Sequence, residues 1–384
     1  MRAGTKQLLE HFTIYNKVLI LLGARQVGKT TLLRKIFPDA LYYSVDNEPV
    51  RKALESYDID VYRALIGTKR QIILDEIHQI NDPGRCAKII FDHLPDIQLI
   101  ITGSSSFHIR NKTTESLAGR KIDYYMYPLT IQEYLYQNKT LDTLESGYFQ
   151  KLFANDFKKL YYHFDTAYFI NDFMIYGQYP DILNMPKDTV FLKNLADSVI
   201  FKDIMELHLI ENRQLAANLL KLLAHQIGSL VNIAELSVSL KADQRTIKRY
   251  IEIFEDSYII FKLYPFTTNK RDEVTKAFKV YFHDTGLRNA VINDFSAIET
   301  RSDKGALFEN LVIAEYMKCN YYSKSDCEFY FWRTKNQSEV DLVMKQGDTI
   351  TGIEIKYTKS RVNRSFCNHY PEARFISVNA DNFL

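Results

Sequence analysis

The feature that most limits what this chain can fold into is Gly23–Thr31, which reads GARQVGKTT and follows the apolar run Val18–Leu22. The glycines let the backbone wrap an anion, and the helix expected next points its free N–H groups at that anion. Lys29 is placed to reach the β- and γ-phosphates of a nucleotide, and the Thr30 hydroxyl is placed to coordinate Mg²⁺. A buried strand before the loop and an amphipathic helix after it argue against a chance match. The predicted nucleotide contacts are Gly23, Ala24, Arg25, Gln26, Val27, Gly28, Lys29, Thr30 and Thr31.

Paired carboxylates follow a second apolar run, Gln71–Leu74. A buried parallel strand has this pattern when its carboxyl end opens onto a site. In phosphate-loop ATPases an aspartate at this place holds Mg²⁺ and a glutamate polarises the attacking water. Asp75 is therefore the predicted metal-side residue and Glu76 the general base. Many strands end in solvated acids, so this pair alone is weak evidence. Together with the upstream loop it indicates hydrolysis.

The strand expected at Gln98–Gly103 ends in polar side chains and continues into Ser104–Ser106. A polar residue at the tip of a strand beside the loop strand is placed to sense the γ-phosphate. Thr102 or Ser104 is the predicted sensor. A serine-rich turn that merely caps the strand explains either residue equally well.

Length and composition set the broad class. A chain of 384 residues exceeds one typical core, so two or three domains are expected. Its 46% hydrophobic and 25% charged residues are those of a soluble globular protein, and a net charge of +2 still allows a local basic face. No apolar signal core opens the chain, and no stretch reaches the length of a membrane span. The four cysteines lack CxxC or zinc-like spacing, so we expect a cytoplasmic protein.

A compact unit is expected at Asn232–Phe266. One helix begins at Ile233, a turn follows at Lys241–Gln244, a second helix opens at Arg245, and a strand covers Tyr258–Leu263. That order is a winged helix-turn-helix, a fold that places a helix N-terminus in the major groove of DNA. A lid or a protein contact is the competing use, in which the basic residues form a solvated face. The predicted DNA contacts are Arg245, Lys248 and Arg249.

At this point the motifs resemble a known family. GARQVGKTTLL, LDEIH, ITGSSS, Ser116–Arg120 and Tyr127–Thr130 with Glu133 together resemble prokaryotic AAA-type ATPases, AAA_14-like, that carry a C-terminal DUF4143 region. The resemblance implies a parallel sheet whose sensor strand lies between the loop strand and the acidic strand. Arg120 is its conspicuous basic residue. Contact with the γ-phosphate in the same molecule, contact across a subunit interface and a simple structural ion pair are the open alternatives.

Two further motifs match what the resemblance leads us to expect, the second of them in the DUF4143 pattern. Gly177–Pro180 stands where a Gly-Gly-Tyr-Pro turn is expected, with Gln178 in place of the second glycine. Phe278–Asp284 is predicted to be a strand, and Asp284 is predicted to cap the helix that follows at Thr285.

The C-terminal part carries a second chemical pattern. A helical Glu309 precedes the alternating Glu339–Val343, and Glu354 and Lys356 lie two apart on the next strand. This order resembles the PD-(D/E)xK nuclease fold. In that resemblance Asp341 and Glu354 are oxygen ligands for Mg²⁺, Glu309 binds a metal or its water, and Lys356 activates water or stabilises the phosphorane-like charge.

The prediction for the whole chain is an α/β protein in three parts. Residues 1–136 form a P-loop AAA-type ATPase core, residues 137–290 a helical connector or lid with a winged helix at about 213–266, and residues 291–384 a restriction-endonuclease-like α/β domain. The predicted function is a Mg²⁺-dependent ATPase that acts on or with DNA, with a metal-dependent nuclease activity left open. The alternative is a nucleotide-switched signalling or scaffold ATPase that binds a protein partner or its own copies through a non-catalytic C-terminal domain.

Overall fold

The computed structural model describes residues 2–103, 116–141, 166–198, 210–267, 277–334, 336–358 and 363–383. The contacts between residues divide the chain into two compact units. The first comprises residues 1–128, 198–211 and 256–258, and the second comprises residues 129–197, 212–255 and 259–384. No helix among the described residues is long and apolar enough to cross a membrane.

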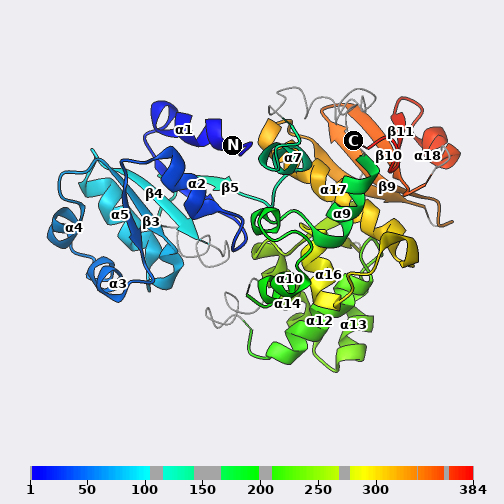
Figure 1. Cartoon of the computed structure of the whole chain (residues 1–384), viewed down its shortest axis with the longest axis horizontal. Coiled ribbons are helices and arrows are strands. Elements are labelled where there is room, and N and C mark those ends of the chain that lie inside the picture. The colour runs from blue at the N-terminus through cyan, green and yellow to red at the C-terminus, as the bar shows by residue number, and fades with distance from the viewer. Residues whose placement is uncertain are drawn as a thin grey trace. The chain divides into compact units, whose positions relative to one another are not determined.

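Within the described residues, the first unit is built on a parallel sheet of five strands in the order β2-β3-β4-β1-β5 (Figure 1). β4 lies between β1 and β3, which is the order that the resemblance implied. The carboxyl ends of parallel strands meet at one edge of a sheet, so the loop after β1, the acids after β3 and the tip of β4 come together. The strands are β1 (Val18–Leu22), β2 (Leu41–Ser44), β3 (Gln71–Asp75), β4 (Gln98–Gly103) and β5 (Lys121–Tyr125).

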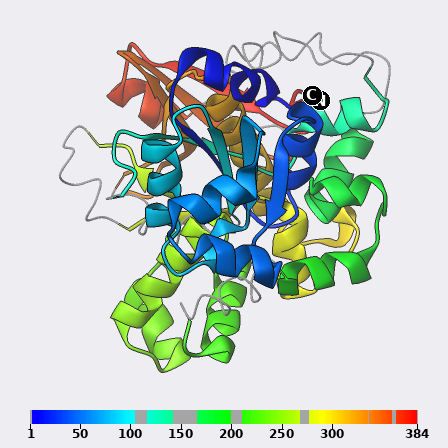
Figure 2. The same cartoon turned by 90° about the vertical axis from the view of Figure 1, so that its left-hand side faces the viewer.

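Helices cover this sheet, as the blue and cyan segments in Figure 2 show. All of β1 is buried, which explains why its sequence is a continuous apolar run. The helix α5 begins where the sequence predicts, because the side chain of Asp82 accepts the N–H of Arg85 at 2.8 Å. The helices are α1 (Thr5–Ile14), α2 (Lys29–Ile36), α3 (Glu48–Leu54), α4 (Ile59–Ile66) and α5 (Pro83–His93), with the 3-10 turn η1 (Ile77–Gln79).

The second unit has a helical part arranged around α16, which packs against α9, α10 and α12 (Figure 1). The buried Arg288 of α16 donates to the carbonyl of Ala224 at 2.7 Å and to Asp303 Oδ2 at 2.6 Å. Asp284 caps α16, since its Oδ1 accepts the N–H of Leu287 at 2.8 Å. The helices are α7 (Ile131–Gln137), α9 (Thr166–Tyr176), η3 (Pro180–Leu183), α10 (Thr189–Asp197), α12 (Arg213–His225), α13 (Ile233–Leu240), α14 (Gln244–Asp256), α16 (Thr285–Ile292), η5 (Ile298–Thr300), α17 (Lys304–Ser323) and α18 (Arg364–His369).

Two helical predictions are only partly covered by the structure. The helix expected at residues 192–208 corresponds to α10, and its part from residue 199 onward lies outside the described residues. Most of the connector expected at residues 137–170 also lies outside them.

The turn at Gly177 differs in detail from the one that the resemblance implied. Gly177 has φ of +75°, and a Cβ there would lie 2.1 Å from Asp284 Oδ1, so a side chain is excluded. A side chain is accommodated at the next residue, Gln178, because both its backbone and its side-chain amide form hydrogen bonds. Its backbone N–H donates to Asp284 Oδ2 at 2.6 Å, and its Oε1 accepts from Lys318 at 2.9 Å.

The described part of the second unit also holds a mixed sheet of six strands in the order β11-β10-β9-β8-β6-β7. The winged-helix hairpin β6–β7 is antiparallel, and β6 pairs in parallel with β8 through Tyr264 and Tyr330. The hairpin and the C-terminal strands therefore form one sheet, which the boundary predicted at residue 290 would cut. The strands are β6 (Ile260–Pro265), β7 (Lys279–Phe282), β8 (Glu328–Arg333), β9 (Glu339–Gln346), β10 (Thr349–Ile355) and β11 (Arg374–Val378).

Candidate functional site

The loop after β1 has the backbone geometry of an anion cradle. Gly23 has φ of +152°, and a Cβ there would lie 2.1 Å from the carbonyl oxygen of Met126, so only glycine fits. Gly28 is left-handed with φ of +92° and begins α2. The ammonium of Lys29 lies inside the loop and donates to the carbonyls of Gly23 at 2.8 Å and Ala24 at 2.9 Å. The loop and the amino end of α2 thus present N–H groups and one ammonium to a common space.

Asp75 is the centre of the site. Its Oδ2 accepts from Thr30 Oγ1 at 2.8 Å and from the hydroxyl of Tyr42 at 2.6 Å, and its Oδ1 accepts from Thr102 Oγ1. The structure therefore brings Thr30, Asp75 and Thr102 together, as the sequence predicts. The second sensor candidate, Ser104, lies outside the described residues.

Glu76 follows in a left-handed conformation with φ of +56°, which is uncommon for a residue with a side chain. Its N–H donates to Thr102 Oγ1 at 3.3 Å, and its Oε2 lies 3.1 Å from Nδ1 of the buried His78. Burial raises the pKa of Glu76, but His78, Lys29 and Arg25 outweigh it and lower that pKa to about 2. Glu76 is thus an ionised, positioned carboxylate.

Arg120 lies at the other end of the sheet. β1 and β5 run parallel with Val18 paired to Lys121, so Arg120 precedes the amino ends of these strands while the phosphate loop follows the carboxyl end of β1. The five residues of β1 separate the two ends by roughly 16 Å. Its Nε instead donates to Asp92 Oδ1 at 2.8 Å. Arg120 thus lies away from the phosphate loop of its own molecule and forms an ion pair with Asp92.

The C-terminal unit gathers three of its four predicted site residues on the β9–β10 hairpin. Lys356 Nζ lies 2.8 Å from Asp341 Oδ2 and 3.1 Å from Glu354 Oε1. The same Asp341 oxygen accepts the N–H of Ile355 at 2.8 Å. Burial lowers the pKa of Lys356, but the two carboxylates outweigh it and raise that pKa, so the lysine is charged.

The fourth residue, Glu309 on α17, is held by the winged-helix strand β7. Its Oε1 accepts from the Tyr281 hydroxyl at 2.6 Å and lies 3.6 Å from Lys279 Nζ. Lys279 also donates to Glu339 Oε1, and Arg333 lies 3.4 Å from Glu339 Oε2. Burial and the charge of Asp341 raise the pKa of Glu309 to about 7. We call the seven residues the C-terminal charged cluster: Lys279, Glu309, Arg333, Glu339, Asp341, Glu354 and Lys356.

This cluster does not fit the metal that the nuclease resemblance implies. Among the described residues, no three His, Cys, Asp or Glu side chains gather closely enough to hold a metal ion. Oε2 of Glu354 is buried without a hydrogen-bond partner in that part of the chain, but Mg²⁺ needs octahedral coordination by oxygens. Within the residues that it describes, the structure thus does not gather Glu309, Asp341 and Glu354 into a metal-ligand set, and a lysine ammonium lies within 3.6 Å of one oxygen of each.

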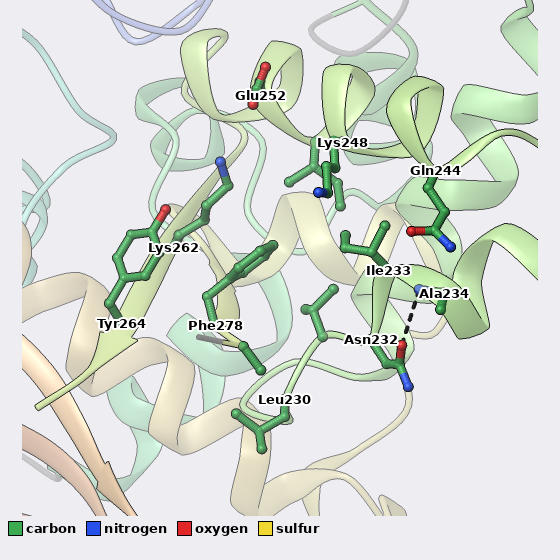
Figure 3. A pocket seen from close by; sticks show the side chains of 13 residues that line it. Leu230, Asn232, Ile233, Ala234, Gln244, Lys248, Glu252, Lys262, Tyr264 and Phe278 are labelled. Atoms are coloured by element: carbon green, nitrogen blue, oxygen red, sulfur yellow. Dashed lines mark hydrogen bonds between the residues drawn. The ribbon is translucent and has the colours of Figure 1, made fainter. Parts of the chain in front are cut away.

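The winged helix exposes the predicted basic residues. Arg245, Lys248 and Arg249 lie on α14 at the spacing that puts side chains on one helix face, and all three are exposed. A pocket of about 590 Å³ lies between α14, the start of α13 and the β6–β7 hairpin. Figure 3 shows Lys248 on one side of it and Phe278 on the other. The face beside α14 is thus basic, aromatic and hollowed.

Three regions of the chain match family models. Residues 15–135 match the AAA domain model AAA_14, and residues 168–297 and 304–380 match domains of unknown function, DUF8612 and DUF4143. Residues 15–135 thus carry an AAA-type domain. The motifs at residues 177–180 and 278–287 both fall in the DUF8612 match, so the attribution of residues 278–287 to the DUF4143 pattern is wrong.

Relatives that align with most of this chain occur in distant organisms. The chain is 26% identical over 372 residues to an uncharacterized protein of Methanocaldococcus jannaschii, covering 91% of this chain and 77% of that one. It is 26% identical over 346 residues to an uncharacterized protein of Mycobacterium tuberculosis, covering 89% and 71%. An uncharacterized protein of Haemophilus influenzae is 22% identical over 384 residues, covering 93% and 86%.

Solved structures resemble the chain only distantly. A signal transduction ATPase with numerous domains and a tetratricopeptide repeat sensor, from Pyrococcus horikoshii, aligns with a TM-score of 0.30 and 16% identity, over 84% of this chain and 45% of that one. A DNA replication initiation factor aligns with a TM-score of 0.27 and 16% identity, over 76% and 92%. Similarity this weak carries no argument about the function of the chain.

Four site residues were not predicted from the sequence. Tyr42 and His78 belong to the AAA domain, and Lys279 and Tyr281 belong to the DUF8612 region. His78, the histidine of LDEIH, stands two residues after Glu76, so the sequence could have indicated it as a neighbour of the predicted base. The other three act through contacts with residues at least 28 positions away, so no local pattern marks them.

Proposed function

We propose that the chain is a Mg²⁺-dependent ATPase. The observation that carries the proposal is the Asp75 carboxylate, which joins the loop through Thr30 and the sensor strand through Thr102. Thr30 and Asp75 are the residues that would hold the metal, and Lys29 would bind the β- and γ-phosphates. Mg²⁺ would supply neutralisation of the charge that develops on the phosphates.

Glu76 acts as the general base in this proposal. It is ionised over the physiological pH range because its pKa is about 2, and His78 and the Thr102 hydroxyl hold its side chain and backbone. The left-handed backbone conformation of Glu76 turns its side chain away from the direction of β3 and fixes it at the edge of the site. A positioned base of this kind orients the attacking water.

The proposal is tested by steady-state ATP hydrolysis and nucleotide binding. Lys29→Ala should lose nucleotide binding, whereas Glu76→Gln should bind ATP and turn it over about 10²- to 10⁴-fold more slowly. Lys35→Ala is the matched control, because Lys35 is an exposed lysine of the same helix. Normal hydrolysis by both site variants would show that the site lies elsewhere.

We further propose that the ATPase contacts DNA through α14. The support is the exposed Arg245, Lys248 and Arg249 on one face, next to the pocket beside the hairpin. In this proposal the basic residues contact phosphates and the hairpin adds aromatic surface. A nucleotide-switched scaffold that binds a protein partner is the other outcome, and it would show no salt-sensitive binding to DNA.

Two predictions from the sequence, the nuclease activity and the role of Arg120, differ in this proposal. Metal-dependent nuclease activity is left out, because the C-terminal charged cluster already pairs its acids with lysines. A role of Arg120 at the nucleotide of a neighbouring copy requires a homo-oligomer and the opening of its ion pair with Asp92.

A further inference from the structure

Lys279 is an unusual lysine. It is the first residue of β7, and its side chain is 1% exposed although it carries an ammonium group. The ammonium lies 3.6 Å from Glu309 Oε1, donates to Glu339 Oε1 and lies 5.3 Å above the ring of Phe331. These partners come from α17, β9 and β8, so one side chain of the winged-helix hairpin reaches three elements of the DUF4143 region.

Burying an ammonium is costly unless carboxylates compensate it. Burial alone lowers the pKa of Lys279, but Glu309 and Glu339 outweigh that effect and raise it, so the group stays charged. The carboxylates in turn need a cation, because Glu309 is itself buried and next to Asp341. Lysine and acids therefore stabilise each other in the way that a divalent ion and its ligands do.

The formal charges of the C-terminal charged cluster nearly cancel. Its acids are Glu309, Glu339, Asp341 and Glu354, and its cations are Lys279, Arg333 and Lys356. With every acid ionised, four negative and three positive charges leave one net negative charge, and this excess is smaller when Glu309, whose pKa is about 7, binds a proton. Without Lys279 the net charge would be minus two, which is the charge that a divalent cation neutralises.

We propose that Lys279 is an internal counter-ion of the C-terminal charged cluster. It pairs with Glu309 and Glu339 while Lys356 pairs with Asp341 and Glu354, so that lysines neutralise the acids that the nuclease resemblance assigns to a divalent metal. The cluster is then a metal-independent centre that is complete only when the winged-helix hairpin supplies β7. It joins the DUF8612 and DUF4143 regions electrostatically, in addition to the β6–β8 pairing. The chain has the acids and the lysine of the nuclease pattern, but in this proposal they form an ion-pair network and hold no metal.

Binding of Mn²⁺ to the full-length chain tests this proposal. All proteins carry Asp75→Asn, so that the nucleotide site does not contribute, and free Mn²⁺ is counted by electron paramagnetic resonance. Lys279→Met should gain Mn²⁺ binding that the parent lacks, because one cation next to two carboxylates is removed. Lys279→Arg keeps the charge and should behave as the parent does.

Lys262→Met is the matched control. Lys262 lies on the other strand of the same hairpin, is 10% exposed and pairs with Glu255 at 2.7 Å, away from the cluster. This variant should leave Mn²⁺ binding unchanged. Equal gains in both lysine variants would overturn the proposal, since any loss of a lysine would then have the same effect.

A second comparison does not depend on the folding of Lys279→Met. The parent is compared with a variant that also carries Asp341→Asn and Glu354→Gln. Both proteins should bind the same amount of Mn²⁺, because these two carboxylates hold none in the parent. If the parent does bind Mn²⁺ through these two carboxylates, a metal fits with the lysine in place and the proposal is wrong. Because every protein lacks Asp75, either result is independent of whether the chain hydrolyses ATP.

Discussion

The hydroxyl of Thr102 donates a hydrogen bond to Asp75 Oδ1, although the two residues lie on separate strands 27 positions apart. The same oxygen atom of Thr102 accepts the N–H of Glu76 at 3.3 Å. One hydroxyl at the tip of β4 thus fixes both the proposed metal-side residue and the proposed base. This arrangement links the state of the sensor strand to the two groups that hydrolysis needs.

Thr102→Val removes that hydroxyl while keeping the shape of the side chain. We expect kcat to fall roughly 10- to 100-fold, because Asp75 and Glu76 lose their common anchor and small misplacements of catalytic groups are costly. The KM for ATP should change little, since the loop keeps its own contacts. Steady-state hydrolysis measures both values. Thr68→Val, at an exposed threonine of the same unit, is the control; a change confined to KM would contradict the role given to Thr102.

His78→Ala should shift the pH dependence of hydrolysis. The pKa of Glu76 is about 2 against an ordinary value of 4.5, because His78 and Lys29 outweigh burial. Without His78, less opposes the effect of burial and the pKa of Glu76 rises. The acid limb of kcat/KM should therefore move to higher pH while the plateau at alkaline pH remains. His93→Ala, at an exposed histidine, should not move it. An equal loss of activity at every pH would speak against this explanation.

The same shift has a consequence for stability. Because the pKa of Glu76 is lower in the folded chain than its ordinary value of 4.5, ionised Glu76 stabilises the fold above that pH. This contribution is lost as the pH falls from about 4.5 towards 2. Glu76→Gln should therefore flatten the dependence of the unfolding free energy on pH within this window, which urea unfolding at a series of pH values measures. An unchanged slope would mean that Glu76 titrates alike in both states.

A buried ion pair on α17 offers a test of stability in the second unit. Glu315 and Lys318 are both fully buried and lie 3.3 Å apart, and Lys318 also donates to the carbonyl of Leu129 at 3.0 Å. Lys318→Met should cost about 3–5 kcal/mol, because it leaves a buried carboxylate without its cation. The double variant with Glu315→Gln should recover part of that loss.

Trp332 is a suitable probe for this measurement. It is the single tryptophan of the sequence, it is 4% exposed, and it belongs to the second unit. Urea unfolding followed by its fluorescence therefore reports on the unit that contains the ion pair. If the double variant were less stable than Lys318→Met alone, the two residues would not be acting as a pair.

Replacing Arg245, Lys248 and Arg249 by alanine tests the DNA contact. The triple variant should bind duplex DNA more weakly, and the slope of log K against log salt should decrease by about 2 to 3, because three phosphate contacts are lost. Fluorescence anisotropy at several salt concentrations measures both. A variant with alanine at the exposed Lys52, Lys69 and Lys88 removes the same charge from the first unit and should bind normally. Equal weakening in both variants would indicate nonspecific attraction.

Local patterns predicted much of the fold and of the nucleotide site. The left-handed turn at Gly28 that begins α2, the strand ending in Asp75 and the cap at Asp284 all depend on neighbours within a few residues. Backbone sterics, hydrophobic burial and capping act over that range, so the sequence carries them directly. The alternation that places Glu354 and Lys356 on one side of β10 was legible for the same reason.

The tertiary structure decided what long-range pairing controls. It placed Arg120 at the end of the sheet opposite the phosphate loop, because strand direction and order set that position. It joined the winged-helix hairpin to β8, and it brought Lys279 from one family region to Glu309 in another. These contacts depend on which distant segments bury surface against each other. The sequence alone therefore determined the nucleotide loop and its acids, while the fold decided which charges neutralise the C-terminal acids.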